Sequence, residues 1–182
     1  MPEIKHFPKT HVAYVSEMGP MGEAVKRGFD RLFAWVKAQN VQPLGPSIGI
    51  FYDDPAKVPP EKLRSELCVP VAHEVQASGL VQIKDIGDVQ VAAIVYQGEQ
   101  NIMTAYNQLY DWLHAEGYRD SGAPIETYQS KPGEELRAEV AVPIVKMELL
   151  AAPKPPKKAV KKPVEKTSAK AKKKPVKRGK KK

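Results

Sequence analysis

Two glutamates stand at the centre of a nine-residue stretch that occurs twice in the chain. Residues 63–71 read LRSELCVPV and residues 136–144 read LRAEVAVPI, so Glu66 and Glu139 occupy matching places. Each copy alternates as a β-strand does, which puts its glutamate on the face opposite an aliphatic stripe. A carboxylate that is covered without a partner is costly. These two side chains are therefore candidate anchors for a ligand.

A plainer interpretation of both glutamates is a solvated strand face. Glu66 would then pair with Arg64 and Glu139 with Arg137, two positions away in each strand. Exposed pairs of this kind contribute little to stability. The residues around Glu139 are smaller and more apolar, so we expect Glu139, rather than Glu66, to be the charged anchor.

Further side chains on the predicted strands could form the walls of the same cleft. Glu126 and Tyr128 share one strand face, and their counterparts in the first half of the chain are Gly49 and Phe51. Aromatic faces beside a buried anion suit an amphipathic cation, although the same aromatics fit a packed core equally well. The predicted ligand-binding set is Glu139, Glu66, Glu126, Tyr128, Tyr96 and Phe51.

No catalytic or metal-binding constellation is visible. The four histidines show no ligand spacing, and one cysteine, Cys68, cannot form a zinc cluster and is expected to be inert in an apolar strand. There is no glycine-rich phosphate loop and no serine elbow. We therefore predict no catalytic residue, metal or cofactor. The open alternative is a hydrolase in which two glutamates converge across the cleft and activate water.

Charge divides the chain into two parts. Residues 151–182 hold 15 Lys and Arg against one acid, which leaves 29 − 15 = 14 bases and 21 − 1 = 20 acids in residues 1–150. We expect a folded domain over 1–150 and a separate basic tail over 151–182. The single cysteine fits a reducing compartment, and no signal peptide or membrane-length apolar run is present. These features predict a soluble cytoplasmic protein.

The tail consists largely of Lys, Pro and Ala, and we expect it to be disordered because it has almost no apolar mass to bury. Its lysine clusters predict salt-dependent, sequence-independent association with DNA or RNA phosphates, which would place the protein with the nucleoid. A tail that only improves solubility is the alternative. The predicted nucleic-acid contacts are Lys157, Lys158, Lys161, Lys162, Lys172, Lys173, Lys174, Lys177, Arg178, Lys180, Lys181 and Lys182.

The repeat extends beyond the glutamate strands. Residues 3–15 resemble 82–94 at an offset of 82 − 3 = 79, and 31–41 resemble 108–118 at 108 − 31 = 77. The glutamate strands match at 136 − 63 = 73, so the offsets drift only where loops are expected. Self-similarity of this kind predicts two equivalent halves, about 3–71 and 82–144.

Periodicity predicts the same elements in each half. Strands are expected at 3–7, 11–17, 48–52 and 63–71 around a helix at 22–39, and at 80–86, 90–97, 124–129 and 136–147 around a helix at 101–116. Tandem strand–helix–strand–strand units predict an α+β fold, with one curved antiparallel sheet and two helices on one face. Trp35 and Trp112 should lie in the core. Both repeat glutamates should lie on the other face, in a cleft between the halves.

The repeat, the tryptophan-bearing helices (RLFAWV, QLYDWL), the segment PIETY and the closing strand AEVAVPI resemble the GyrI-like small-molecule-binding domains over residues 3–147. These domains also serve as effector-binding domains of AraC- and MerR-type regulators. The resemblance implies a cleft between repeats, a central glutamate that maps to Glu139, and amphipathic cationic ligands. Some members inhibit DNA gyrase, which makes gyrase a candidate partner, and others hydrolyse reactive cyclopropane compounds.

The chain departs from this family pattern in two places. No helix-turn-helix domain precedes residue 3, so we expect it not to be a complete regulator of the usual type. The lysine tail is similar to that of linker-histone-like proteins instead. The leading hypothesis is a non-enzymatic ligand-binding module with a nucleic-acid-binding tail. The alternatives are a hydrolase and a DNA-associated architectural or gyrase-modulating protein.

Overall fold

The fold was analysed in a computed structural model, which describes residues 1–98, 102–130 and 133–147. The first half of the chain forms strands β1 (Glu3–Phe7) and β2 (Thr10–Met18), helix α1 (Met21–Ala38), β3 (Ser47–Phe51), a short 3₁₀ turn (Pro60–Lys62) and β4 (Arg64–Pro70). The second half forms β5 (Gln82–Ile86), β6 (Val89–Gln97), α2 (Ile102–Ala115), β7 (Tyr118–Asp120), β8 (Ile125–Tyr128) and β9 (Arg137–Lys146). The predicted α+β class is confirmed.

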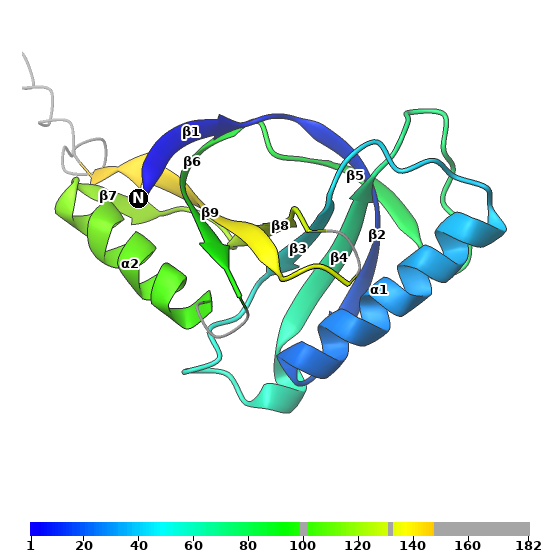
Figure 1. Cartoon of the computed structure of the whole chain (residues 1–182), viewed down its shortest axis with the longest axis horizontal. Helices are drawn as coiled ribbons and strands as arrows, with labels where there is room; N and C mark the ends of the chain where they lie inside the picture. The colour runs from blue at the N-terminus through cyan, green and yellow to red at the C-terminus, as the bar shows by residue number, and fades with distance from the viewer. Residues whose placement is uncertain (99–101, 131–132, 148–182) are drawn as a thin grey trace, which may run out of the picture. The chain divides into compact units, whose positions relative to one another are not determined.

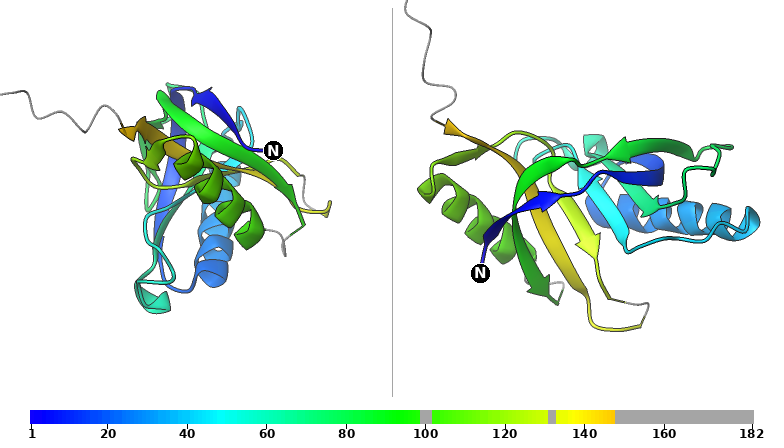
Figure 2. Two further views of the ribbon diagram at one scale, coloured as in Figure 1. Left: turned by 90° about the vertical axis from the view of Figure 1, so that its left-hand side faces the viewer. Right: turned by 90° about the horizontal axis from the view of Figure 1, so that it is seen from above.

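All nine strands belong to one antiparallel sheet that curls into a half-barrel. Its order is β1-β6-β9-β8-β3-β4-β2-β5, and β7 pairs with the outer part of β9. The central neighbours are β3 and β8, one from each half. The two edge strands are exchanged, because β1 pairs with β6 of the second half and β5 pairs with β2 of the first half. Two further views show β1 running beside β6 (Figure 2).

The two helices lie against the same face of the sheet, on either side of the central strands (Figure 1). Helix α1 covers Ala13, Val15, Leu67 and Val69 of β2 and β4. Helix α2 covers the corresponding strands β6 and β9, where Val140, Val142 and Ile144 are buried. The aliphatic stripes of both glutamate strands thus meet the helices, as the alternation predicts. Trp35 and Trp112 are half-buried and pack against these two clusters.

A third apolar cluster occupies the opposite face of the sheet. It comprises buried side chains from both halves, including Phe7, Ile48, Cys68, Val91 and Ile125. The sheet is therefore covered by hydrocarbon on both faces near its centre. Among the described residues, no helix is both long enough and apolar enough to span a membrane.

Candidate ligand-binding site

A buried carboxylate, Glu126, lies at the centre of the molecule on the face that carries the helices. Strand β8 places Glu126 opposite Val140 of β9, and Val140 belongs to the cluster under α2. On its other side Glu126 faces Gly49 of β3, its counterpart in the sequence repeat. Only 2% of Glu126 is exposed. Glu126 is thus buried at the junction of the two halves.

Tyrosine hydroxyls surround this carboxylate. Tyr106 of α2 donates a hydrogen bond to Oε1 at 2.8 Å, and Tyr128 of β8 donates to Oε2 at 2.8 Å. Tyr96 of β6 also acts as a hydrogen-bond partner that lowers the pKa of Glu126. Tyr96 and Tyr128 both pair with the small Ala138 on β9, one from each side. The four groups come from two strands, β6 and β8, and helix α2.

Burial and hydrogen bonding shift the pKa of Glu126 in opposite directions. Desolvation is the larger effect and raises the pKa of the carboxyl above its ordinary value, while the tyrosine hydroxyls lower it. The same burial, with the neighbouring carboxylate, raises the pKa of the Tyr106 and Tyr128 hydroxyls. Both tyrosines therefore remain proton donors. Within the described residues, no basic side chain lies within salt-bridge distance of Glu126.

Aromatic side chains line the approach from α1. The Phe29 ring meets the Tyr128 ring edge-on, with centroids 5.6 Å apart, and Phe33 stacks on Phe29 at 5.8 Å. Phe33 is 44% exposed, whereas Phe51 beneath is buried. A Cβ on Gly49 would lie 2.9 Å from the Phe51 ring and 3.2 Å from the Tyr128 hydroxyl oxygen. Glycine at this position thus keeps the space beside Glu126 free of a side chain.

The predicted site residues divide between the two faces of the sheet. Glu126, Tyr128, Tyr96 and Phe51 lie together on the helix face. Phe29 and Tyr106 join them, although the sequence offered only their aromatic character as a signal. Strand alternation places Glu66 and Glu139 on the opposite face, as expected, and the structure does not bring them to Glu126.

Each of these two glutamates is paired with a lysine from the other half of the chain. Lys5 of β1 contacts Glu139 at 2.5 Å, and Lys84 of β5 contacts Glu66, which also accepts a hydrogen bond from Tyr52 at 2.6 Å. The predicted pairing with neighbouring arginines is not seen, because Arg64 bonds Asp53 and Arg137 bonds Gln129. The charge of each glutamate is therefore compensated within the chain.

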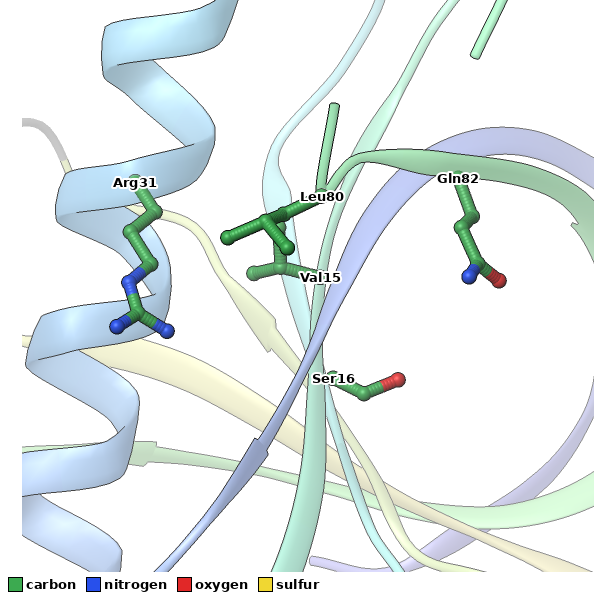
Figure 3. A pocket seen from close by; sticks show the side chains of 5 residues that line it. All are labelled: Val15, Ser16, Arg31, Leu80 and Gln82. Atoms are coloured by element: carbon green, nitrogen blue, oxygen red, sulfur yellow. The ribbon is translucent and has the colours of Figure 1, made fainter. Parts of the chain in front are cut away.

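A hollow lies at the edge of the sheet, away from Glu126 (Figure 3). Its volume is about 230 Å³, and its lining residues are Val15, Ser16, Arg31, Leu80 and Gln82. Small-molecule sites usually exceed about 300 Å³. The lining shares no residue with the Glu126 cluster. Cys68 is also unsuited to chemistry, because burial raises its thiol pKa to about 12.

A buried carboxylate with tyrosine and phenylalanine side chains around it, contributed in part by both helices, is typical of a small-molecule-binding domain. The chain belongs to the GyrI-like small-molecule-binding domain family, whose model matches residues 1–145. It is 30% identical over 132 residues to the DNA gyrase inhibitor of Salmonella typhimurium, covering 69% of this chain and 84% of that protein. It is 31% identical to the DNA gyrase inhibitor of Edwardsiella piscicida, covering 70% and 87%.

Solved structures share the fold. The C-terminal domain of EcmrR superposes with a TM-score of 0.65 at 16% identity, covering 80% of this chain and 98% of that one. The structure of SAV2435 bound to tetraphenylphosphonium superposes with a TM-score of 0.56 at 10% identity, covering 82% and 96%. At these identities the likeness concerns the fold alone.

Proposed function

We propose that this domain binds amphipathic organic cations between α1 and α2, with Glu126 as the anionic anchor. One observation carries the proposal: a carboxylate that is 2% exposed has tyrosine hydroxyls, but no basic group, as its partners among the described residues. Glu66 and Glu139 each already have a lysine. The anchor is therefore assigned to Glu126 instead of Glu139.

The physical reason for a cationic ligand is the cost of burying an unpaired charge. Burial raises the pKa of Glu126 above its ordinary value, so the negative charge of the buried carboxylate is held at a cost. An organic cation would compensate that charge, and its apolar surface would lie against the aromatic rings. A cation over a tyrosine or phenylalanine face gains roughly 0.5–2 kcal/mol in addition.

Further carboxylates favour the approach of a cation. Burial raises the pKa of the Tyr110 hydroxyl on α2, and the nearby carboxylates of Asp120 and Asp54 raise it further. Residues 1–150 as a whole hold 14 bases and 20 acids, as counted above. Negative potential at the entrance to a site raises the local concentration of cations. The likeness in fold to a protein with bound tetraphenylphosphonium, a lipophilic cation, supports the same ligand class.

The test is titration of the full chain with tetraphenylphosphonium by isothermal calorimetry at about pH 8. We expect saturable binding that Glu126→Gln weakens at least about tenfold, since the ion pair is lost while the side-chain shape is kept. Glu139→Gln is the matched control and should bind as wild type does. Uncharged triphenylphosphine oxide should bind more weakly than the cation. Equal affinity of the wild type and Glu126→Gln for the cation would remove Glu126 from the site.

Inhibition of DNA gyrase is a second candidate function, which the similarity to two DNA gyrase inhibitors favours. A supercoiling assay with purified bacterial gyrase tests it, and adding tetraphenylphosphonium to the same assay asks whether the ligand modulates the effect. The hydrolase alternative gains no support from these contacts, because Glu66 and Glu139 are occupied by lysines. Nucleic-acid binding by the tail remains a proposal, since the tail lies outside the described residues.

A further inference from the structure

Two histidines and an aspartate meet at the edge of the sheet, away from the Glu126 cluster. His11 of β2 and Asp85 of β5 are direct cross-strand partners. The His11 Nδ1 atom lies 2.6 Å from Asp85 Oδ1, a hydrogen bond between the ring and the carboxylate. This contact exists only because β5 of the second half pairs with β2 of the first.

His73 reaches the same point from the segment that follows β4. The backbone N–H of Val71 donates to the carbonyl of His11 at 3.0 Å, which holds this segment against β2. The rings of His11 and His73 then lie with their centroids 4.3 Å apart, tilted by 40°. One potential ligand atom from each of His11, His73 and Asp85 lies within 4.8 Å of the others. Small side-chain rotations would bring three such atoms around one ion.

The three groups are in suitable chemical states for metal binding. Lys9 contacts Oδ2 of Asp85 at 2.9 Å and His11 contacts Oδ1 at 2.6 Å, and both contacts favour the carboxylate form that a metal needs. The other ring nitrogen of His11, Nε2, is buried and has no hydrogen-bond partner among the described residues. Because a carboxylate only accepts, His11 Nδ1–H donates to Asp85, and Nε2 is the ring nitrogen that can present a lone pair to an ion. The His11 side chain is 16% exposed and that of Asp85 is 37% exposed, which leaves a path from solvent.

We propose that His11, His73 and Asp85 form a binding site for a divalent transition metal of the zinc type. Two imidazoles and one carboxylate are the borderline nitrogen and oxygen ligands that Zn²⁺, Co²⁺ and Ni²⁺ accept. Three protein ligands leave at least one coordination position for water. The ion would join the segment after β4 to the edge strand β5 and to its neighbour β2.

The opposite edge of the sheet, formed by β1 and β6, provides an internal comparison. At the repeat offset of 79, His11 corresponds to Gln90 and Asp85 to His6, which are cross-strand partners in β1 and β6. That pair offers an amide in place of one ligand. The ion would thus be bound at one edge of the sheet and not at the other, and the fold itself does not require it.

The test is titration of the chelator-treated full chain with Zn²⁺ by calorimetry, and with Co²⁺ by visible absorption. We expect one ion per chain and a rise in melting temperature on adding Zn²⁺. His73→Ala and Asp85→Asn alter exposed groups, so both variants should fold, and each should weaken binding at least about tenfold. His114→Ala, which removes an exposed histidine on α2, should leave the affinity unchanged.

Substitution of Lys9 should have the opposite effect and raise the affinity for the metal. The Lys9 Nζ atom lies 2.9 Å from Asp85 Oδ2, where it competes with a metal for the carboxylate. Lys9→Met should therefore bind Zn²⁺ more tightly than the wild type. Absence of binding in the wild type, or binding that survives both His73→Ala and Asp85→Asn, would overturn the assignment.

Discussion

At the scale of single residues, the environment of each glutamate decides its role more than its place in a motif. Glu66 and Glu139 stand in the repeated strands, yet each is compensated by a lysine. Glu126 stands in a short strand with no conspicuous motif, and its hydrogen-bond partners among the described residues are tyrosine hydroxyls. The binding proposal follows from this difference in compensation.

Glu126→Gln should stabilise the domain at neutral and higher pH. Burial raises the pKa of Glu126 above its ordinary value of 4.5, so the folded chain holds this proton more tightly than the unfolded chain does. Its contribution to stability is therefore full below about pH 4.5 and is lost as the pH rises through the folded pKa. Glutamine has no such loss. Melting temperatures of both proteins between about pH 4 and pH 8 should converge at the acidic end and diverge at the other.

Cation affinity should follow the opposite trend with pH. A cation pairs with the ionised carboxylate, so binding must release any proton held by Glu126. Affinity for tetraphenylphosphonium should rise with pH through the raised pKa and then level off. Calorimetry in buffers of different ionisation enthalpy measures the proton released. A flat affinity from about pH 5 to pH 8 would contradict this mechanism.

Gly49→Ala should damage both stability and binding. The new methyl group would lie 2.9 Å from the Phe51 ring and 3.2 Å from the Tyr128 hydroxyl oxygen, so one of these side chains must move. Overpacking of this kind costs about 1–3 kcal/mol, measurable by urea unfolding. Gly22→Ala is the control, because a Cβ there meets nothing within 4 Å. That variant should be as stable as the wild type or slightly more stable.

At the scale of elements, the two edge strands are held by reciprocal ion pairs. Lys5 on β1 reaches Glu139 in the second half, and Lys84 on β5 reaches Glu66 in the first. Lys5 and Lys84 correspond at the repeat offset of 79, and the glutamates at 73. Each edge strand thus brings a lysine to a partly buried glutamate of the other half.

Lys84→Met should destabilise the domain, because Glu66 would keep its charge while its side chain is only 14% exposed. We expect a loss of about 1–3 kcal/mol in the free energy of unfolding. The double variant Lys84→Met/Glu66→Gln should recover most of that loss. Lys26→Met removes an exposed pair with Asp30 on α1 and should change little. Equal effects of Lys84→Met and Lys26→Met would show that the pair across the sheet is unimportant.

Periodicity predicts the elements well because each signal is local. The helix expected at 22–39 is found at Met21–Ala38, and the strand expected at 90–97 at Val89–Gln97. Strand β7 was not predicted, since Arg119 and Asp120 are exposed and show no alternation. It forms because the outer part of β9 offers it a partner.

Contacts between distant strands could not be predicted in the same way. Alternation correctly assigns Glu126 and Tyr128 to one face of β8, but it does not say which neighbours β8 will have. The pairing of β8 with β3 and β9 brings Gly49 and Ala138 beside them. The meeting of His11, His73 and Asp85 likewise depends on the β2–β5 pairing and leaves no spacing pattern in the chain.

At the scale of the whole molecule, we expect ligand binding and nucleic-acid binding to be separable. Residues 151–182 carry 15 Lys and Arg and lie outside the described residues, whereas the proposed cation site lies within them. Deleting them should abolish salt-sensitive retention on DNA, since affinity from phosphate contacts falls steeply with salt. Affinity for tetraphenylphosphonium should not change. Electrophoretic mobility shifts at two salt concentrations and calorimetry on the same truncated protein provide the two readouts.

The exchange of edge strands makes the two halves mutually dependent. A chain cut between β4 and β5 would yield two fragments. The first would hold β2, β3 and β4 of its side of the sheet but lack the edge strand β5, and the second would hold β6, β7, β8 and β9 but lack the edge strand β1. Neither piece should fold in isolation, whereas co-expression should reconstitute the sheet by complementation. The same connectivity permits domain swapping, in which the halves of two intact chains pair with each other. Shortening the 72–81 linker, which connects β4 to β5, should therefore yield a domain-swapped dimer.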